Sequence, residues 1–304
     1  MTNLKLNQLI RSFSLLTILA LSSLQPAFGQ KVSKARLDTM PRQYSGPRPL
    51  QDLVSDLTAK FGWNISLEEP PWIESQARGP MYRPENRYGS SIHNSKLKLP
   101  EGKLDLTSVF ASEYTSAKEL IEACLKAYSA QGNQGGYIVR ESNGMLQIVP
   151  DPESPAVQLA GPSLLDWEIE VPVEKRYPRE HFAALCDAIQ QTSAIDCDAN
   201  YAGLSFDKEY LANWPPERVE WGCSTMKARA ALEELLSHSM TTMTWQQKCH
   251  PVEGGGRICY LTLLPLEVEI QTSKGKVIRR TLCYDRGWRF PYPQPPPPPL
   301  PEDK

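Results

Sequence analysis

The sequence lacks the motifs by which catalytic and cofactor sites are recognised. It has no HExxH or comparable metal-ligand spacing, and its glycine run at 254–256 lacks the GK[ST] ending of a phosphate-binding loop. We therefore predict no catalytic, cofactor-binding or metal-binding residues. The four histidines are interpreted as solvent-exposed or capping residues: His93, His181, His238 and His250.

Carboxylates that could act as an acid–base pair are also missing, because the acidic pairs are adjacent in sequence. Glu68-Glu69 and Glu233-Glu234 are such pairs, and neighbouring side chains diverge in a strand or a helix. We interpret both pairs as parts of solvated faces.

Basic residues do not outnumber acidic residues in this sequence, and apolar runs long enough to span a membrane are lacking. Lys5 and Arg11, the apolar run 15–21 and the small-residue site 27–29 together have the pattern of a secretory signal peptide. The apolar run is about half of the ~20 residues that a membrane span requires. Removal of residues 1–29 leaves 31 basic and 35 acidic residues, a net charge of −4. This mild acidity argues against a nucleic-acid partner.

The seven cysteines are consistent with an oxidising compartment, and their odd number leaves at least one without an intramolecular partner. Cys249 and Cys259 lie on strands expected to pair, so we predict a cross-strand disulfide rather than a metal site, worth about 2–3 kcal/mol. Cys124 lies on the apolar face of a helix and is expected to be the free thiol. The pairing of the others stays open: Cys186, Cys197, Cys223 and Cys283.

The first half shows alternating helix and strand patterns. Pro49 is expected to begin a helix that Gly62 ends, and residues 63–69 alternate as a strand. Thr115 is expected to cap a second helix, which is followed by a hairpin turning at Asn143-Gly144. Residues 30–46 are expected to be irregular, with an edge strand near 37–40, and residues 70–96 to form a long loop.

The second half repeats this plan. Phe182, Leu185, Cys186 and Ile189 match the spacing of the first helix of the first half, and a second helix and a hairpin follow. Leu50 and Leu120 lie 70 positions apart, whereas the matching Phe182 and Ala231 lie 49 apart, and the difference of 21 is close to the length of the loop at 70–96. A single insertion in the first half therefore accounts for the difference in spacing between the two halves.

Two stretches of the first half, PLQDLVSDLTAKFGWNISLEE and TSAKELIEACLKAYSAQG followed by GGYIVRESNGMLQIVP, carry a family resemblance. With ARAALEELLSHSMTTMTWQQ and RICYLTLLP in the second half, they are similar to the short N-terminal (STN) domain of secretins and TonB-dependent receptors. The resemblance implies small periplasmic α+β domains that contact other proteins and have no catalytic residues. The chain departs from the family pattern in its long insertion, its cysteine-rich second copy and the lack of a following barrel or secretin body.

These patterns together predict an α+β protein of two tandem small domains, each a helix pair packed on a short mixed or antiparallel sheet. The expected organisation along the chain is: signal peptide 1–29, irregular segment 30–46, first copy 47–150 with the inserted loop 70–96, linker 151–163, second copy 164–265, strand pair 266–287 and proline-rich tail 288–304.

We expect a secreted or periplasmic, non-enzymatic module of the cell envelope that binds a protein or polymer. The alternative is a secreted hydrolase whose site is assembled from distant residues. The candidate binding residues combine aromatic and arginine side chains in the inserted loop, although such a loop can equally pack its aromatic residues onto the domain. They are Trp72, Arg78, Tyr82, Arg83, Arg87 and Tyr88. Whether the proline-rich tail is a spacer or a ligand stays open.

The signal peptide gives a direct prediction. Because residues 1–29 combine a positive end, an apolar core and a small-residue cleavage site, the exported protein should begin at or near Gln30. Intact-mass measurement of protein recovered from outside the cytoplasm checks this, and a mass that retains Met1 would contradict it.

Overall fold

The first helix and strand in the described part of the chain differ from what the sequence predicts. The computed structural model describes residues 31–71, 81–82, 97–98, 101–193, 196–201, 217–239, 242–251, 257–272 and 275–280. Lys34–Leu37 form helix α2 and Gln43–Pro47 form strand β1, so the expected irregular segment with a strand near Leu37 is wrong. Leu37 is buried because it faces the core from a helix. The signal peptide and the proline-rich tail lie outside the described residues.

Proline and glycine bound the next helix as predicted. Helix α3 runs over Pro49–Phe61 with proline in its first turn, and Gly62 ends it in the left-handed conformation at φ 72°. Strand β2, Ile65–Glu68, follows, and all of its residues are buried. A strand buried on both faces must have a neighbouring layer on each side.

The helix and hairpin of residues 117–150 are confirmed, with a shift at the cap. Helix α5, Ala117–Ala130, is capped by Ser116 rather than Thr115, and the Glu119 carboxylate accepts a hydrogen bond from the Thr115 N–H at 2.7 Å. The Glu119 N–H donates in turn to the Ser116 hydroxyl at 3.2 Å, so the arrangement resembles a capping box shifted by one residue, and the hydrogen bonds that the Glu119 carboxylate accepts lower its pKa. Strands β6, Tyr137–Ser142, and β7, Met145–Pro150, turn at Asn143 and Gly144, both at positive φ.

Several short elements were not predicted. They lie in the inserted segment, before α5, in the expected linker and at the start of the second copy: β3 Met81–Tyr82, α4 Thr107–Ala111, α6 Pro155–Ala160 and the 3-10 helix η3 Leu164–Asp166. Strand β4, Leu97–Lys98, directly follows the insertion. Strand β5, Glu101–Asp105, returns from the insertion and pairs with β1 in antiparallel fashion.

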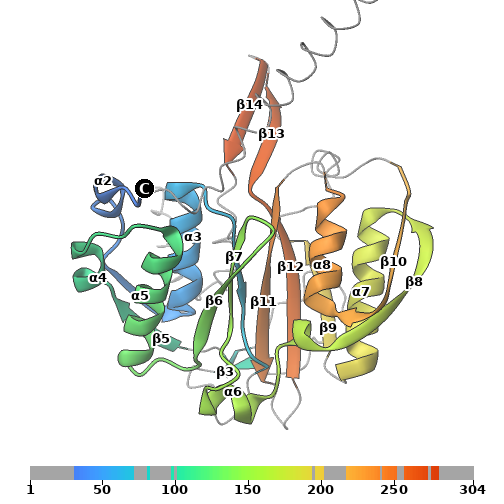
Figure 1. Cartoon of the computed structure of the whole chain (residues 1–304), viewed down its shortest axis with the longest axis horizontal. Helices are drawn as coiled ribbons and strands as arrows, with labels where there is room; N and C mark the ends of the chain where they lie inside the picture. The colour runs from blue at the N-terminus through green and yellow to red at the C-terminus, as the bar shows by residue number, and fades with distance from the viewer. Residues whose placement is uncertain are drawn as a thin grey trace, which may run out of the picture.

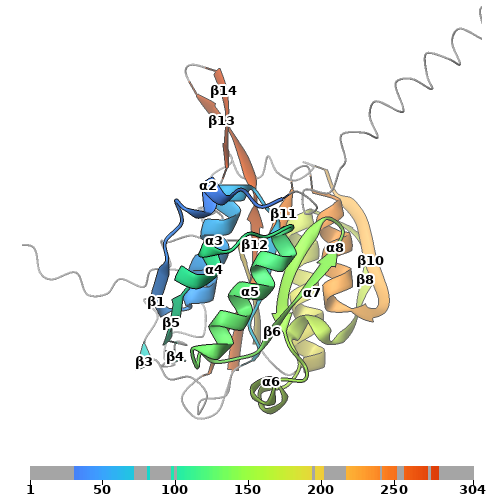
Figure 2. The ribbon, with the colours of Figure 1, turned by 60° about the vertical axis from the view of Figure 1, so that its left-hand side comes forward.

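The second half has the elements that the repeat predicts. They are β8 Glu168–Arg176, α7 Pro178–Ser193, β9 Asp196–Tyr201, β10 Val219–Lys227, α8 Ala228–Ser237, β11 Met243–Pro251 and β12 Arg257–Pro265. The predicted strand pair beyond them is β13 Glu267–Thr272 with β14 Gly275–Arg280, a hairpin that projects from the rest of the protein (Figures 1 and 2).

Strand pairing is the same in the two halves. In the first, β1 pairs with β5, β6 with β7 in a hairpin, and β7 with β2 in parallel. In the second, β8 pairs with β10, β11 with β12 in a hairpin, and β12 with β9 in parallel. Each half therefore has an antiparallel strand pair and a mixed three-stranded unit, where the sequence predicts a single short sheet.

The two three-stranded units form one continuous sheet. Its strand order is β6-β7-β2-β11-β12-β9, and β2 of the first half pairs in parallel with β11 of the second. The proposed division into two domains around residues 151–163 therefore stays a prediction, because strands of both halves pair directly.

The halves place their helices on opposite faces of this sheet. Figure 1 shows α3 and α5 on one side of the strands and α7 and α8 on the other. Side chains of β2 alternate accordingly, with Ile65 and Leu67 in the core of the first half and Glu68 directed to α8. The pair β1–β5 packs outside α3 and α5, and β8–β10 packs outside α7 and α8 (Figure 2). The order of layers is thus strand pair, helices, shared sheet, helices, strand pair.

A shared sheet should make the halves unfold together. Leu57 in the first core and Leu232 in the second are fully buried, so replacing either with alanine should cost about 2–5 kcal/mol. We expect both variants to shift one common melting transition, followed by circular dichroism, whereas Leu159→Ala, at an exposed position, should leave it in place. A variant that splits the melt into two transitions would show that the halves are independent domains.

Candidate functional site

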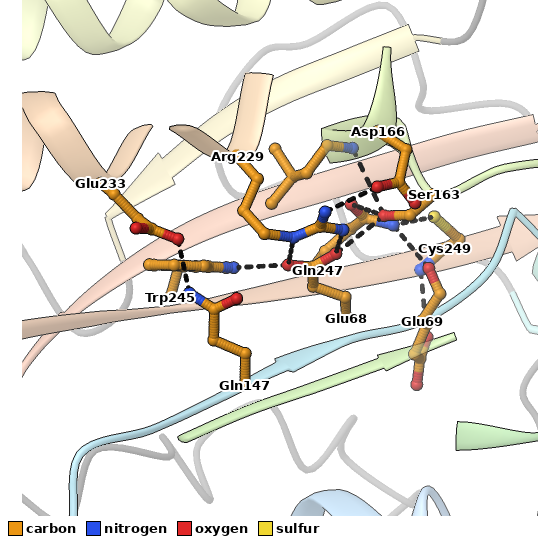
Figure 3. A network of polar contacts seen from close by, with 11 residues as sticks. Glu68, Glu69, Gln147, Ser163, Asp166, Arg229, Glu233, Trp245, Gln247 and Cys249 are labelled. Atoms are coloured by element: carbon orange, nitrogen blue, oxygen red, sulfur yellow. Dashed lines mark hydrogen bonds and ion pairs between the residues drawn. The ribbon is translucent and has the colours of Figure 1, made fainter. Parts of the chain in front are cut away.

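Buried polar side chains gather where the two halves meet. Figure 3 shows them around the end of β2, with contributions from β11, from α8 and from the segment just before and within η3. Two adjacent acids at this end, Glu68 and Glu69, point to different partners. Their side chains diverge, as the sequence predicts, but they are buried rather than solvated, and that part of the prediction is wrong.

Glu68 is the centre of the first cluster. Its carboxylate accepts two hydrogen bonds from the Arg229 guanidinium, from Nε at 2.8 Å and from Nη2 at 2.6 Å. The Trp245 indole N–H donates to it at 3.2 Å, and the Ser163 hydroxyl lies 2.9 Å away. Glu68 is 0% exposed, and a carboxylate so buried is tolerated only when it is paired and hydrogen-bonded.

Arg229 joins Glu68 to a second acid. It is the second residue of α8, and its Nη1 donates to Asp166 in η3 at 2.6 Å. Burial lowers the pKa of Arg229, but the hydrogen bonds and charges of Glu68 and Asp166 outweigh this effect and raise it above its ordinary value. The guanidinium therefore carries its charge at every pH at which the protein is folded.

Glu69 is the centre of the second cluster, on the side of the first half. Arg48 donates to its carboxylate from Nε at 2.7 Å and from Nη2 at 3.1 Å. The backbone N–H of Cys249 donates to the same carboxylate at 3.0 Å. Arg48 has a left-handed backbone, φ 57°, at the N-cap of α3, which is uncommon for a residue other than glycine.

Gln247 of β11 connects the two clusters. Its amide nitrogen donates to the backbone carbonyl of Glu69, and its Oε1 lies 3.1 Å from the Ser163 hydroxyl. Glu69 N–H in turn donates to the Gln247 carbonyl, which continues the parallel pairing of β2 with β11. Strand pairing and side-chain bonding therefore fix the same register.

Glu233, one turn further along α8, reaches the hairpin of the first half. Its carboxylate accepts hydrogen bonds from Gln147 at 2.6 Å, from the Ser142 hydroxyl at 2.7 Å and from Asn143 at 2.9 Å. Helix α8 is thus bound to β2 through Arg229 and to the hairpin β6–β7 through Glu233. Glu233 is half-buried, whereas the adjacent Glu234 is exposed as predicted.

The predicted disulfide is present. Cys249 and Cys259 are directly opposite on β11 and β12 and are bonded, with 4.1 Å between their Cα atoms. Cys124 is a buried free thiol, as predicted, and burial raises its pKa well above the ordinary value. Cys223 is also a buried free thiol, Cys186 is buried in the core of the second half, and Cys197 occupies the register position beside Cys259 on β9.

The candidate partner-binding residues fall almost wholly outside the described part of the chain. Tyr82 lies in β3, which pairs with β4 directly after the insertion, and β4 lies against β11. This end of the insertion thus packs on the second half. The remaining candidates are outside the described residues: Trp72, Arg78, Arg83, Arg87 and Tyr88.

The histidines are placed differently from one another. His238 is exposed at the C-terminus of α8, as predicted. His181 is fully buried, with Nε2 2.7 Å from the Val219 carbonyl oxygen and its ring edge-on to Trp221, so its predicted exposure is wrong. Among the residues that the structure describes, no group of histidine, cysteine or acidic side chains has an arrangement that would hold a metal ion.

Comparison of the chain with protein-family models, with curated proteins and with solved structures finds no match. The similarity to the STN domain therefore stays a prediction, and the geometry of the chain itself has to carry the functional argument. In the described part of the chain, no helix combines the length and apolar character of a membrane span.

The polar network was missed because its partners are far apart in sequence. Glu68 and Arg229 are separated by 161 positions, and no local pattern links them. One signal was present: a Glu-Glu pair directly after an alternating apolar strand is unusual unless a cation compensates it. In the structure each carboxylate of this pair has its own arginine, so the network joins the two halves.

Removing one charge of the central pair should be strongly destabilising. Glu68→Gln leaves the buried Arg229 with only the partly exposed Asp166 as an ionic partner and should lower the free energy of unfolding by about 3–5 kcal/mol, measured by urea denaturation. Glu234→Gln, at an exposed position on the same helix α8 that carries Arg229, is the matched control and should change it by less than about 0.5 kcal/mol.

A double substitution tests whether the cost comes from the unpaired charge. Replacing Glu68 and Arg229 together with methionine removes both charges and should recover most of the loss. If Glu68→Gln is as stable as Glu234→Gln, the buried pair does not hold the halves together.

Proposed function

We propose that this protein is a non-enzymatic interaction module that works in the periplasm or outside the cell and binds an envelope protein or polymer. The observation that carries this proposal is the edge of the shared sheet at β6, which pairs with β7 alone in the described part of the chain. An edge strand presents unpaired N–H and C=O groups, which can pair with an added strand of another molecule.

The polar side chains of the junction support a non-enzymatic role. The hydroxyl of Ser163 is engaged by Glu68 and Gln247, and the carboxylates of Glu68 and Glu69 are each paired with an arginine. A catalytic residue has to reach a substrate, and these groups are buried and use their bonding capacity within the protein. Their role is to fix the halves relative to each other, which keeps the outer strands in place.

The location is supported by the disulfide and by the predicted signal peptide. Disulfides persist in oxidising compartments, and Cys249–Cys259 joins two strands next to the junction. The order strand, helix, strand, strand, helix, hairpin in each half is the order that the STN resemblance implies, and this agreement favours a binding role.

We further propose that the partner binds mainly through the first half, where β6 supplies the edge and the arginine- and tyrosine-rich insertion selects the partner. Deleting residues 72–93 from the full chain should release the partner in a pull-down from envelope extracts, whereas deleting residues 291–304 should leave it bound. Retention after the first deletion with release after the second would identify the proline segment as the ligand instead.

A single substitution tests the edge itself. Glu141 is exposed in β6, and proline at this position removes a backbone N–H from the open edge. Glu141→Pro should lose the partner in the same pull-down, whereas Glu141→Ala, which keeps the N–H, should retain it. Equal capture by both variants would show that the partner does not use this edge.

A further inference from the structure

The shared sheet ends in two strands that have one neighbour each. In the described part of the chain, β6 pairs with β7 alone and β9 pairs with β12 alone. The turn at Asn143-Gly144 has two residues, which places Ser142, Arg140 and Ile138 in hydrogen-bonded pairs with β7. The N–H and C=O groups of Tyr137, Val139 and Glu141 are consequently directed away from β7, to the open edge.

The protein contains an internal template for what can pair with this edge. In the second half, the strand that corresponds to β6 is β11, and its outer edge pairs in parallel with β2. The strand that corresponds to β2 is β9. The halves are therefore joined by a contact between β2 of the first half and β11, the counterpart of β6, in the second. In the described part of the chain, the two remaining outer strands, β6 and β9, stay open at the ends of the sheet.

Strand direction permits the same contact between two molecules. Strands β2, β7 and β11 run in one direction, whereas β6, β12 and β9 run in the other. Since β6 and β9 run in the same direction, a second chain in the same orientation presents its β6 parallel to β9 of the first. This is the polarity of the β2–β11 contact.

The charged residues at the open edges correspond to those at the contact between β2 and β11. Arg229, the second residue of α8, pairs with Glu68 on β2, and the second residue of α5 is Lys118, which is half-buried. On β9, Cys197 is in register with Cys259 of the second core, so Asp196 and Asp198 occupy positions of the opposite face. Glu68 likewise occupies the face of β2 that is turned away from the helices of its own half, α3 and α5. A cation on α5, the helix that contacts β6, therefore corresponds to acids on β9.

We propose that this protein associates head to tail with further copies of itself, β9 of one chain adding in parallel to β6 of the next, and Lys118 approaching the acidic positions of β9. The inference rests on the proposed function, because it names a partner for the same β6 edge. The contact joins two different surfaces and leaves an open edge at each end, so the assembly is a chain of variable length rather than a closed dimer.

The experiment measures the mass of the purified, signal-free protein by sedimentation velocity over a range of concentrations. The unaltered chain and Glu141→Ala should associate increasingly with concentration. Glu141→Pro should stay monomeric with an unchanged circular dichroism spectrum, and Lys118→Glu should associate at least about tenfold more weakly. A monomer at every concentration, or association of Glu141→Pro equal to that of Glu141→Ala, would overturn the proposal.

Complementary variants test which edges meet. Lys118→Glu and the double variant Asp196→Lys/Asp198→Lys should each associate weakly alone. An equal mixture should form chains in which the two variants alternate, because both junctions between unlike copies then join opposite charges. If the mixture associates no more strongly than either variant alone, pairing of β9 with β6 is excluded. If the unaltered protein is monomeric but Glu141→Pro still loses its envelope partner, self-association is wrong and the proposed function stands. If Glu141→Pro changes neither self-association nor capture of the envelope partner, both proposals are wrong.

Discussion

The fold depends on the pairing of the Glu68 carboxylate with the Arg229 guanidinium. Both side chains are buried, and a buried charge that loses its main partner is strongly destabilising. Because Glu68 belongs to β2 and Arg229 to α8, the pair can form only when the helices of the second half lie across the sheet of the first. The network thus selects one relative placement of the halves, which hydrophobic burial alone would specify less strictly.

In that placement, the second half is related to the first by a half-turn about an axis that runs across the strands of the shared sheet. It sends the helix pairs to opposite faces, so that α8 covers the sheet face that the first half leaves open. A tandem repeat without this half-turn would stack both helix pairs on one face and expose the other face of the sheet to water. The rotation accounts for the burial of β2 on both faces and for the presence of polar side chains on the second of them.

Elements set by short-range chemistry could be predicted from the sequence, and contacts between distant segments could not. Pro49 and Gly62 bound a helix, Asn143-Gly144 sets a hairpin, and the spacing of the apolar residues identifies the repeat. The pairing of Cys249 with Cys259 followed from their places on the two strands of a hairpin. The sheet shared by the halves, the burial of the acids of β2 and the covering of β11 by β4 depend on segments far apart in the chain, which periodicity does not report. For the same reason, the residues proposed for binding had to be chosen by composition.

The separation of 161 positions between Glu68 and Arg229 also has a consequence for how the chain matures. A chain that emerges from its N-terminus completes the helices and hairpin of the first half well before α8 is available. During that interval β2 has a bare edge and a carboxylate without its cation, so the first half is held in an incomplete, adhesive state. Completion of the shared sheet therefore waits for a late, long-range contact, and factors that shield strand edges would act most strongly before β11, which ends at Pro251, has emerged.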